Sequence, residues 1–393
     1  MSEKQQREEV EITGDGNVIG DSNVVSVTKH YHYGESKGGT SAGATLYLPP
    51  KAYHRLVGRF DELERVMSAL RDPKHKPMVA VIGLGGIGKT ALAREAVERA
   101  WDEKLFEYIV WTSSKTEHFI SERIVRTGVS TQEGDAAYSF DTLLSDIGRQ
   151  CDRVDIAQMP PGQKQAAVKY LLAKKRVLIV MDNLETVPES EKLVADVFQI
   201  LGQSKVLITS RHHVRHERVY TIDLSGFPED EGVTFLREES KARGIEGVAQ
   251  ANRPSLVRVH QATGGAPLAM KLVIGQISRQ PMDVVLDTLK EVSFKGQDYP
   301  FYRFIYRHSW DMLEMNARMA LVDMSVFPPI IGGTVDDVQA ISQAEASAFW
   351  PAMDQLVTLS LVDKIGPVGR ERFALHPLTQ YFIKSDITKE WAD

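Results

Sequence analysis

Eight residues, Gly83 to Thr90 (GLGGIGKT), constrain the fold of this 393-residue chain more than any other segment. They match the pattern G-x-x-x-x-G-K-[ST], in which backbone N–H groups surround phosphate oxygens at the N-terminus of a helix. The apolar run Met78 to Ile82 predicts a strand before the loop, and the apolar spacing of Ala91 to Trp101 predicts a helix after it. A strand, a glycine-rich loop and a helix in this order predict a nucleotide-binding α/β domain.

The loop supplies most of the expected phosphate contacts. Lys89 would neutralise the β and γ phosphates of a nucleotide, and the hydroxyl of Thr90 would hold Mg²⁺. The backbone contacts would come from Gly83, Gly85, Gly86, Ile87 and Gly88. The structural alternative is a glycine-rich turn without a ligand, which the flanking strand and helix signals make the weaker interpretation.

A second apolar run is followed by an acid. Arg176 to Asp182 (RVLIVMD) predicts a buried strand that ends in Asp182, which would be the second Mg²⁺ ligand. A cap or turn aspartate is the structural alternative. The next residue, Asn183, cannot accept a proton as a general base, and Glu185 is the nearest substitute for that role. The alternative for Glu185 is a solvated loop glutamate.

A third strand signal, Lys205 to Arg211 (KVLITSR), ends in a cation. Arg211 could sense a γ phosphate held across the edge of the sheet, so Glu185 and Arg211 are the two catalytic candidates. Three histidines follow within residues 212–216. No nearby cysteine or matched carboxylate completes a four-ligand metal set with them, so we interpret them as solvated loop residues.

The order of these signals predicts the fold class. Between about Tyr53 and Arg211, short apolar runs alternate with helical patterns, which predicts a parallel sheet with helices on both faces. After Leu224 amphipathic helical patterns dominate. Two late strand signals, Leu361 to Ile365 and Arg372 to Leu375, suit a small winged-helix unit. The fold class is therefore an α/β P-loop NTPase followed by a helical domain and a winged-helix domain. The expected boundaries are 1–50 for a disordered N-terminal segment with a linker, 51–223 for the P-loop domain, 224–298 for the helical domain and 299–393 for the winged helix.

Composition limits the class of protein. No run of 18 apolar residues and no apolar N-terminal stretch occur, so neither a membrane span nor a secretory signal is expected. Cys151 is the only cysteine, which excludes an intrachain disulfide and fits a cytoplasmic protein. The 47 basic and 53 acidic residues give a net charge of −6, which argues against nucleic-acid binding as the main activity.

Several segments, in the same order and spacing, resemble NB-ARC domains of the STAND class. The principal matches are Gly83 to Ala93 (GLGGIGKTALA), Phe106 to Ser114 (FEYIVWTSS), Val180 to Glu185 (VMDNLE) and Leu207 to Arg211 (LITSR). Further matches are Leu56 to Asp61 (LVGRFD), Gly264 to Ala269 (GGAPLA) and Leu375 to Leu378 (LHPL). The resemblance covers about residues 53 to 385.

The resemblance implies roles for four more residues. Val57 and Arg59 would contact the base or ribose side of the nucleotide. Pro267 would contact the adenine, and His376 the β phosphate of ADP. From the sequence alone, Pro267 is a helix-start proline, which is compatible with that contact. The alternative for His376 is a core histidine.

The family's mechanism would make the chain a signal-transducing switch. The three domains would close over ADP in the resting form and open when ATP replaces it. The cofactors would be ATP or ADP with Mg²⁺, hydrolysis would be slow, and activation would produce an oligomer in immune defence or regulated cell death. Two departures matter. Asn183 replaces the second acid common in the family, and the sequence stops at Asp393 without a repeat array, so the usual sensor is missing or is supplied by another protein.

The N-terminal segment carries a short repeat. Gly14 to Val18 (GDGNV) and Gly20 to Val24 (GDSNV) recur among β-branched residues. Asparagine ladders and β-branched residues favour cross-β stacking between chains. The segment at about residues 11–28 resembles the RHIM-related amyloid signalling motifs that precede NB-ARC domains in some bacterial and fungal proteins. It would template a partner effector with a similar segment, and a flexible tail is the alternative.

Three functions fit these signals. The preferred one is the oligomerising switch. The second is a turnover P-loop ATPase or kinase with a separate substrate, against which Asn183 and the helical closure domains count. The third is a winged-helix regulator that binds DNA, with Arg370 to Arg372 on the wing. The net charge and the expected role of His376 count against the third.

Overall fold

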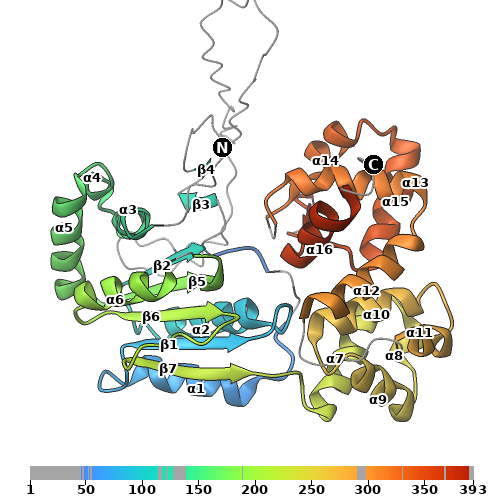
Figure 1. Ribbon diagram of the computed structural model, residues 1–393, viewed down its shortest axis with the longest axis horizontal. Helices are drawn as coiled ribbons and strands as arrows, with labels where there is room; N and C mark the ends of the chain where they lie inside the picture. Colours follow the sequence, from blue (N-terminus) through green and yellow to red (C-terminus); the bar gives the residue numbers. More distant parts are fainter. Residues whose placement is uncertain are drawn as a thin grey trace, which may run out of the picture.

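The computed structural model of the chain has two lobes, one built on a parallel sheet and the other on helices (Figure 1). The described residues are 46, 48–51, 53, 55–113, 117–120, 123–126, 139–187, 189–289, 298–329, 331–366 and 369–388. The repeat at about 11–28 lies outside the described residues and stays a prediction. In the part of the chain that the structure describes, no helix has the length and apolar character needed to cross a membrane.

The sheet lobe contains five parallel strands in the order β2-β5-β6-β1-β7. The strands are β1 Met78–Gly83, β2 Tyr108–Ser113, β5 Val177–Asp182, β6 Lys205–Ser210 and β7 Val219–Leu224, and a hairpin of β3 Glu117–Ile120 and β4 Arg123–Arg126 follows β2. The first, second, fifth and sixth strands coincide with apolar runs. β7 has no such run, because it is an edge strand with an exposed Asp223 and a half-buried Tyr220. Since the five strands run in one direction, their carboxyl ends meet at one edge of the sheet.

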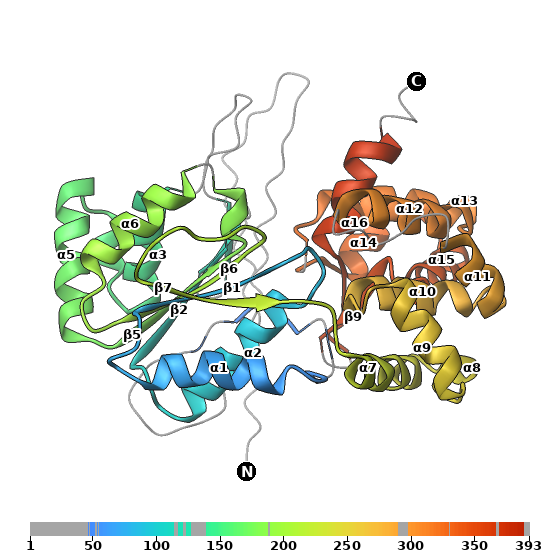
Figure 2. The same cartoon turned by 60° about the horizontal axis from the view of Figure 1, so that its bottom comes forward.

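Helices cover both faces of this sheet, which confirms the predicted α/β fold (Figures 1 and 2). α1 Phe60–Arg71 and α2 Lys89–Asp102 lie on one face, and α3 Phe140–Gln150, α5 Pro161–Lys174 and α6 Ser190–Ile200 lie on the other, with the short α4 Val154–Ala157 between α3 and α5. In β1, Val79 and Val81 belong to the first core, whereas Met78, Ala80 and Ile82 belong to the second. This alternation is the mark of a strand buried on both sides.

The helical lobe begins after β7. Its helices are α7 Glu229–Ala242, α8 Glu246–Ala249, α9 Arg253–Ala262, α10 Pro267–Ile277, α11 Met282–Leu289 and α12 Asp298–Asp311. Prolines at the first turns of α9 and α10 favour helix starts there, because their fixed φ suits that position. Leu224 at the end of β7 packs in the same apolar core as Leu268 and Phe301, so the two lobes share a core.

The C-terminal unit combines helices with a small antiparallel sheet in the order β8-β10-β9. Its elements are α13 Met315–Asp323, η2 Met324–Val326, β8 Gly333–Thr334, α14 Val335–Ser342, α15 Ala346–Thr358, β9 Val362–Ile365, β10 Arg372–Leu375, α16 Pro377–Phe382 and η3 Ile383–Ile387. Thr334 and Asp337 form a capping box that begins α14. The two late strand signals of the sequence coincide with β9 and β10, to within one residue at the start of β9.

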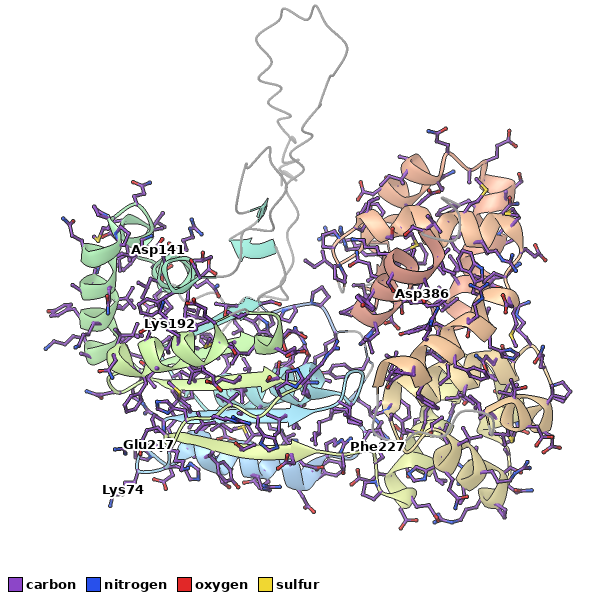
Figure 3. All side chains as sticks on the ribbon, viewed as in Figure 1. Lys74, Asp141, Lys192, Glu217, Phe227 and Asp386 are labelled. Carbon is purple, nitrogen blue, oxygen red and sulfur yellow. The ribbon has the colours of Figure 1, made fainter. Side chains whose placement is uncertain are left out.

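Two junctions hold these parts together. Where β7 leads into α7, Phe227 lies between the sheet lobe and the helical lobe (Figure 3). At the other junction, α10 packs so closely on the C-terminal unit that a Cβ on Gly275 would lie 2.7 Å from backbone atoms of Leu359. The hydroxyl of Ser360 accepts a hydrogen bond from Arg243 and donates one to the backbone oxygen of Lys271 at 2.6 Å. The C-terminal unit is therefore bound to both α7 and α10.

A Gly275→Ala substitution should loosen the junction between α10 and the C-terminal unit. The new methyl group meets rigid backbone, so we expect a loss of roughly 1 to 3 kcal/mol in the free energy of unfolding, measured by urea titration followed by circular dichroism. Gly162→Ala in α5 is the matched control, because nothing lies within 4 Å of a Cβ there. Equal stability of the two variants would contradict this packing.

Candidate nucleotide-binding site

The loop between β1 and α2 is shaped by glycines at positive φ. Gly86 (φ 72°) and Gly88 (φ 101°) have backbone angles that residues with a Cβ rarely adopt. At Gly86 a Cβ would also lie 2.7 Å from the Cβ of Leu268 on α10. The backbone N–H of Leu268 donates to the Gly86 oxygen at 3.2 Å. The loop of the sheet lobe is thus bonded directly to the helical lobe.

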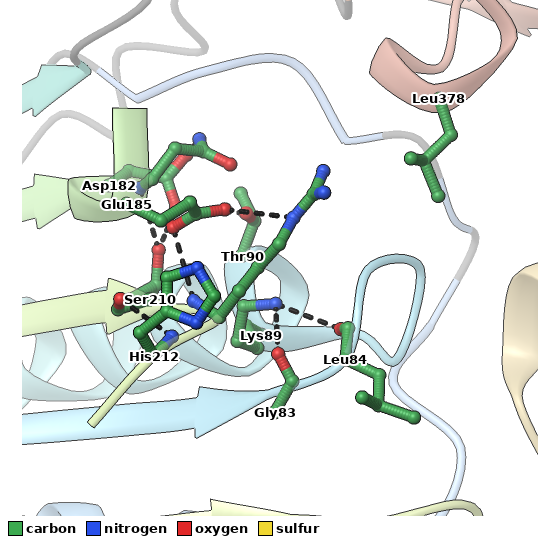
Figure 4. A network of polar contacts seen from close by, with 12 residues as sticks. Gly83, Leu84, Lys89, Thr90, Asp182, Glu185, Ser210, His212 and Leu378 are labelled. Atoms are coloured by element: carbon green, nitrogen blue, oxygen red, sulfur yellow. Dashed lines mark hydrogen bonds and ion pairs between the residues drawn. The ribbon is translucent and has the colours of Figure 1, made fainter. Parts of the chain in front are cut away.

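Lys89 places a positive charge over this loop. Its ammonium donates to the backbone oxygens of Gly83 at 2.7 Å and Leu84 at 2.9 Å, and the residue is 7% exposed (Figure 4). Lys89 is also the first residue of α2, whose N-terminal N–H groups carry partial positive charge. An ammonium group beside a helix N-terminus fits a phosphate group.

Asp182 accepts hydrogen bonds from side chains at the carboxyl ends of the strands. Thr90 and Thr209 donate to its Oδ1 at 2.9 and 2.5 Å, and the Asn183 amide donates to its Oδ2 at 2.8 Å. A hydroxyl and a carboxylate are oxygen ligands of the kind that Mg²⁺ prefers, so Thr90 and Asp182 fit this ion. When bound, Mg²⁺ would neutralise charge on the phosphates. Thr209 was not among the predicted site residues, although its place at the end of β6 is the available signal.

Glu185 and Arg211, the two catalytic candidates, contact each other. Glu185 lies in the short turn η1 Leu184–Thr186 after β5, and Arg211 follows β6. The Glu185 Oε1 lies 3.1 Å from the Arg211 Nε, and its Oε2 accepts from the Arg211 backbone N–H at 3.2 Å. The structure therefore brings the two residues together, but it places the carboxylate against the guanidinium rather than alone in the site.

A cavity of about 220 Å³ lies where the sheet lobe, the helical lobe and the C-terminal unit meet. The predicted site residues in its wall are Val57, Arg59, Gly85, Gly86, Ile87, Gly88, Lys89, Thr90, Glu185, Arg211, Pro267 and His376. Gly83 and Asp182 are not in the wall but contact it through Lys89 and Thr90. The sequence motifs did not point to Tyr53, Arg94, Phe235, Lys271 and Asp363, which also line the cavity.

Tyr53 and Arg94 fix the segment before α1 on α2. The Tyr53 hydroxyl donates to the Ala91 oxygen at 3.3 Å, and Arg94 donates to the Pro49 oxygen and, at 3.0 Å, to Glu98. Burial raises the pKa of Tyr53 well above its usual value, so the phenol stays neutral. This wall of the cavity is made by neutral and ion-paired groups rather than by a free charge.

Arg59 is 2% exposed and binds both lobes. Its guanidinium donates to Glu62 at 3.0 Å and to the Ser225 oxygen at 2.5 Å, and it lies 4.5 Å from the ring centre of Phe227. Burial lowers the pKa of this guanidinium, and the carboxylate of Glu62 opposes that shift. Its backbone N–H donates to Glu231 of α7 at 3.2 Å. Arg59 therefore lines the cavity and also holds the crossing from β7 to α7.

Pro267 and His376 reach the cavity from the other two parts of the molecule. Pro267 is at the first turn of α10, as its sequence context predicted. His376 caps α16, and its Nδ1 accepts from the Leu378 N–H at 3.1 Å. With Nδ1 as an acceptor, the proton of the neutral ring is on Nε2, which makes that nitrogen the donor. The histidine of the C-terminal unit can thus offer an N–H group to an anion.

Known proteins with related sequences match this chain only in part. Putative disease resistance RPP13-like protein 2 of Arabidopsis thaliana is 22% identical over 356 residues, which is 84% of this chain and 39% of that protein. Disease resistance protein RPP13 of the same plant is 22% identical over 281 residues, or 70% of this chain and 32% of that protein. The chain therefore spans about two fifths or less of the length of these relatives.

The fold and the loop motif are those of a P-loop NTPase fold. Residues 59–243 match the NB-ARC domain. The solved structure of the STAND protein with a tetratricopeptide repeat sensor, PH0952 from Pyrococcus horikoshii, has the same fold, with a TM-score of 0.54 at 17% identity over 86% of this chain and 43% of that chain. Residues 59–243 therefore match the family whose motifs the sequence resembles, and the likeness to the solved STAND protein shows the fold.

A Thr209→Val substitution should weaken the binding of Mg²⁺ with the nucleotide. Valine has the same shape but removes the hydroxyl that donates to Asp182 and accepts from the Asn183 N–H at 2.9 Å. Removing such a support costs roughly 10-fold or more in metal affinity. The Mg²⁺ affinity would be measured by titrating Mg²⁺ into the protein bound to a fluorescent nucleotide. Thr209→Ser keeps the hydroxyl and should match the wild type, and a wild-type result for valine would contradict the role of Thr209.

Proposed function

We propose that the protein is an ATP/ADP-dependent signal-transducing switch of the NLR-like type, held closed around ADP at rest. The observation that carries the proposal is the shared cavity, whose wall contains Lys89 of the sheet lobe, Pro267 of the helical lobe and His376 of the C-terminal unit. A ligand that contacts all three parts favours the arrangement in which they meet. A change of phosphate number in such a ligand can therefore change the arrangement.

The contacts around Gly85 indicate how a third phosphate could act. A Cβ on Gly85 would lie 3.2 Å from Leu378 Cδ1 of α16 and 3.6 Å from the Arg211 Nη2. The C-terminal unit thus lies against the phosphate loop, Gly83 to Thr90, beside the cation proposed to sense the γ phosphate. We infer that ADP is compatible with this contact and that ATP weakens it. The phosphates would be held by Lys89, and Mg²⁺ by Thr90 and Asp182.

The element order supports interpreting the C-terminal unit as a winged helix. A helix, a short strand, two helices and a strand pair follow one another from α13 to β10. The DNA-binding alternative has less support, because α15, Ala346–Thr358, contains no lysine or arginine and exposes Trp350. The proposed domain boundaries remain 51–223, 224–298 and 299–393.

The turnover-enzyme alternative also has less support. Asn183 cannot act as a base, and Glu185 is paired with Arg211. We therefore propose slow hydrolysis. Activation would open the molecule and allow oligomerisation, and the repeat at about 11–28 would recruit or template an effector with a similar segment. The named relatives are disease resistance proteins, which supports a role in immune defence. The single buried cysteine supports the cytoplasm as its compartment.

The nucleotide content of the purified protein tests the proposal. The freshly purified chain is denatured, and the released adenine nucleotide is quantified by chromatography. We expect close to one ADP per chain, and little or none for Lys89→Ala, because that change removes the ammonium over the loop. Nucleotide-free protein that rapidly hydrolyses added ATP would indicate the turnover enzyme instead.

Shortening Leu378 should weaken closure without changing any residue of the phosphate loop. Leu378 is 3% exposed, so Leu378→Ala removes buried contacts of α16 with the loop. We expect a fluorescent ADP analogue to dissociate roughly tenfold faster, the change expected for a loss of about 1.4 kcal/mol. Leu378→Met conserves volume and should dissociate at nearly the wild-type rate. The same rate for alanine and methionine would contradict a role of this contact in closure.

A further inference from the structure

We propose that Glu185 is a positioning residue that aims Arg211 at the third phosphate, and that it is not the general base of hydrolysis. The inference rests on the proposed ATP/ADP switch and deepens it, because it assigns the discrimination between the two nucleotides to a pair of residues. Glu185 and Arg211 come from turns after neighbouring strands, β5 and β6. They meet at the edge of the sheet where the phosphate loop also lies.

Both oxygens of the Glu185 carboxylate are engaged by the same residue. Oε1 pairs with the Arg211 Nε at 3.1 Å, and Oε2 accepts from the Arg211 backbone N–H at 3.2 Å (Figure 4). The Glu185 side chain is 7% exposed, so its carboxylate is largely shielded from water, whereas the Arg211 side chain is 38% exposed. One contact fixes the direction of the guanidinium and the other fixes the backbone from which it extends. The carboxylate is therefore held against Arg211 by both of its oxygens.

The turn that carries Glu185 is itself anchored to β6. The Asn183 backbone N–H donates to the Thr209 hydroxyl at 2.9 Å, and the Val187 N–H closes the turn on the Leu184 oxygen at 3.0 Å. Asn183 has a φ of 60°, the left-handed geometry that lets the chain reverse directly after β5. The position of the carboxylate relative to Arg211 is therefore set by backbone and hydroxyl contacts on both strands.

The guanidinium so held is directed at the phosphate loop. A Cβ on Gly85 would lie 3.5 Å from the Arg211 Cζ and 3.6 Å from its Nη2. Glu185 engages Nε, and the two terminal nitrogens are the ones that carry paired donors in the plane of the group. The Arg211 side chain is 38% exposed, so these nitrogens can reach a ligand in the cavity. Planar paired donors suit phosphate oxygens.

The pair therefore offers a specific contact to ATP that ADP does not use. Charge-assisted hydrogen bonds to a phosphate strengthen when the donor is held in place before binding, because less freedom is lost on contact. Without Glu185 the Arg211 side chain would keep its charge but lose its direction. Removing either residue should then lower the affinity for ATP more than the affinity for ADP. Removing both should lower the ATP affinity little more than removing one.

The experiment is a double-mutant cycle on the full chain with Mg²⁺ present. Affinities for ADP and for a non-hydrolysable ATP analogue are measured by calorimetry for the wild type, Glu185→Gln, Arg211→Ala and the double variant. We expect each single variant to lose roughly tenfold in affinity for the ATP analogue, with the ADP affinity within about twofold, and the double variant to lose no more than Arg211→Ala. Glu189→Gln is the matched control, since Glu189 is exposed and pairs with Lys192.

Two results would overturn the inference while the switch proposal stands. The first is an unchanged affinity of Glu185→Gln for the ATP analogue together with abolished single-turnover hydrolysis, which is the behaviour of a general base. The second is full additivity in the double variant, which would mean that the residues act independently. If Glu185→Gln does not fold, Arg211→Lys tests whether the direction of the donors matters, because lysine keeps the charge but lacks the planar, paired donors of the guanidinium. A wild-type chain that binds neither nucleotide would instead overturn the proposed function.

Discussion

The structure depends on the absence of a side chain at Gly86 of the phosphate loop. Because Gly86 has no Cβ, Leu268 of α10 can donate to its oxygen, and at the neighbouring Gly85 the Leu378 side chain of α16 and the Arg211 guanidinium lie close by. One short loop therefore touches the helical lobe and the C-terminal unit at once. The nucleotide cavity is closed by the same contacts that join the parts of the molecule.

This arrangement explains why chemistry and movement would be coupled in one site. The positive charge that would bind phosphates comes from Lys89 and from the N-terminus of α2 beside the loop. His376 and Leu378 instead belong to the C-terminal unit, which is attached through α7 and α10. A ligand that binds the loop but is incompatible with the Leu378 contact would shift the equilibrium from the closed to the open arrangement, because it binds the open one more tightly. Slow hydrolysis suits such a switch, because the lifetime of the open arrangement would then equal the time that ATP stays bound and intact.

Motifs tied to backbone geometry were predictable from the sequence, and contacts between side chains of separate turns were not. Asp182 and Thr90 could be paired because both follow strands whose carboxyl ends meet. The strand β7 was missed, since an edge strand needs no continuous apolar run. The Glu185–Arg211 pair was missed for a different reason: each residue was assigned a separate role, and only the packing of η1 against the end of β6 brings them together.

In the proposed switch, the number of phosphates on the bound nucleotide sets the distance between the two lobes. Spin labels at Tyr170 of α5 and Met319 of α13, which are 66% and 49% exposed, would measure that distance by electron resonance. Cys151 would not interfere, because burial raises its pKa to about 12 and keeps the thiol unreactive. We predict one short, narrow distance with ADP and a longer, broader distribution with a non-hydrolysable ATP analogue and Mg²⁺. Identical distributions in both states of a nucleotide-binding chain would contradict the account.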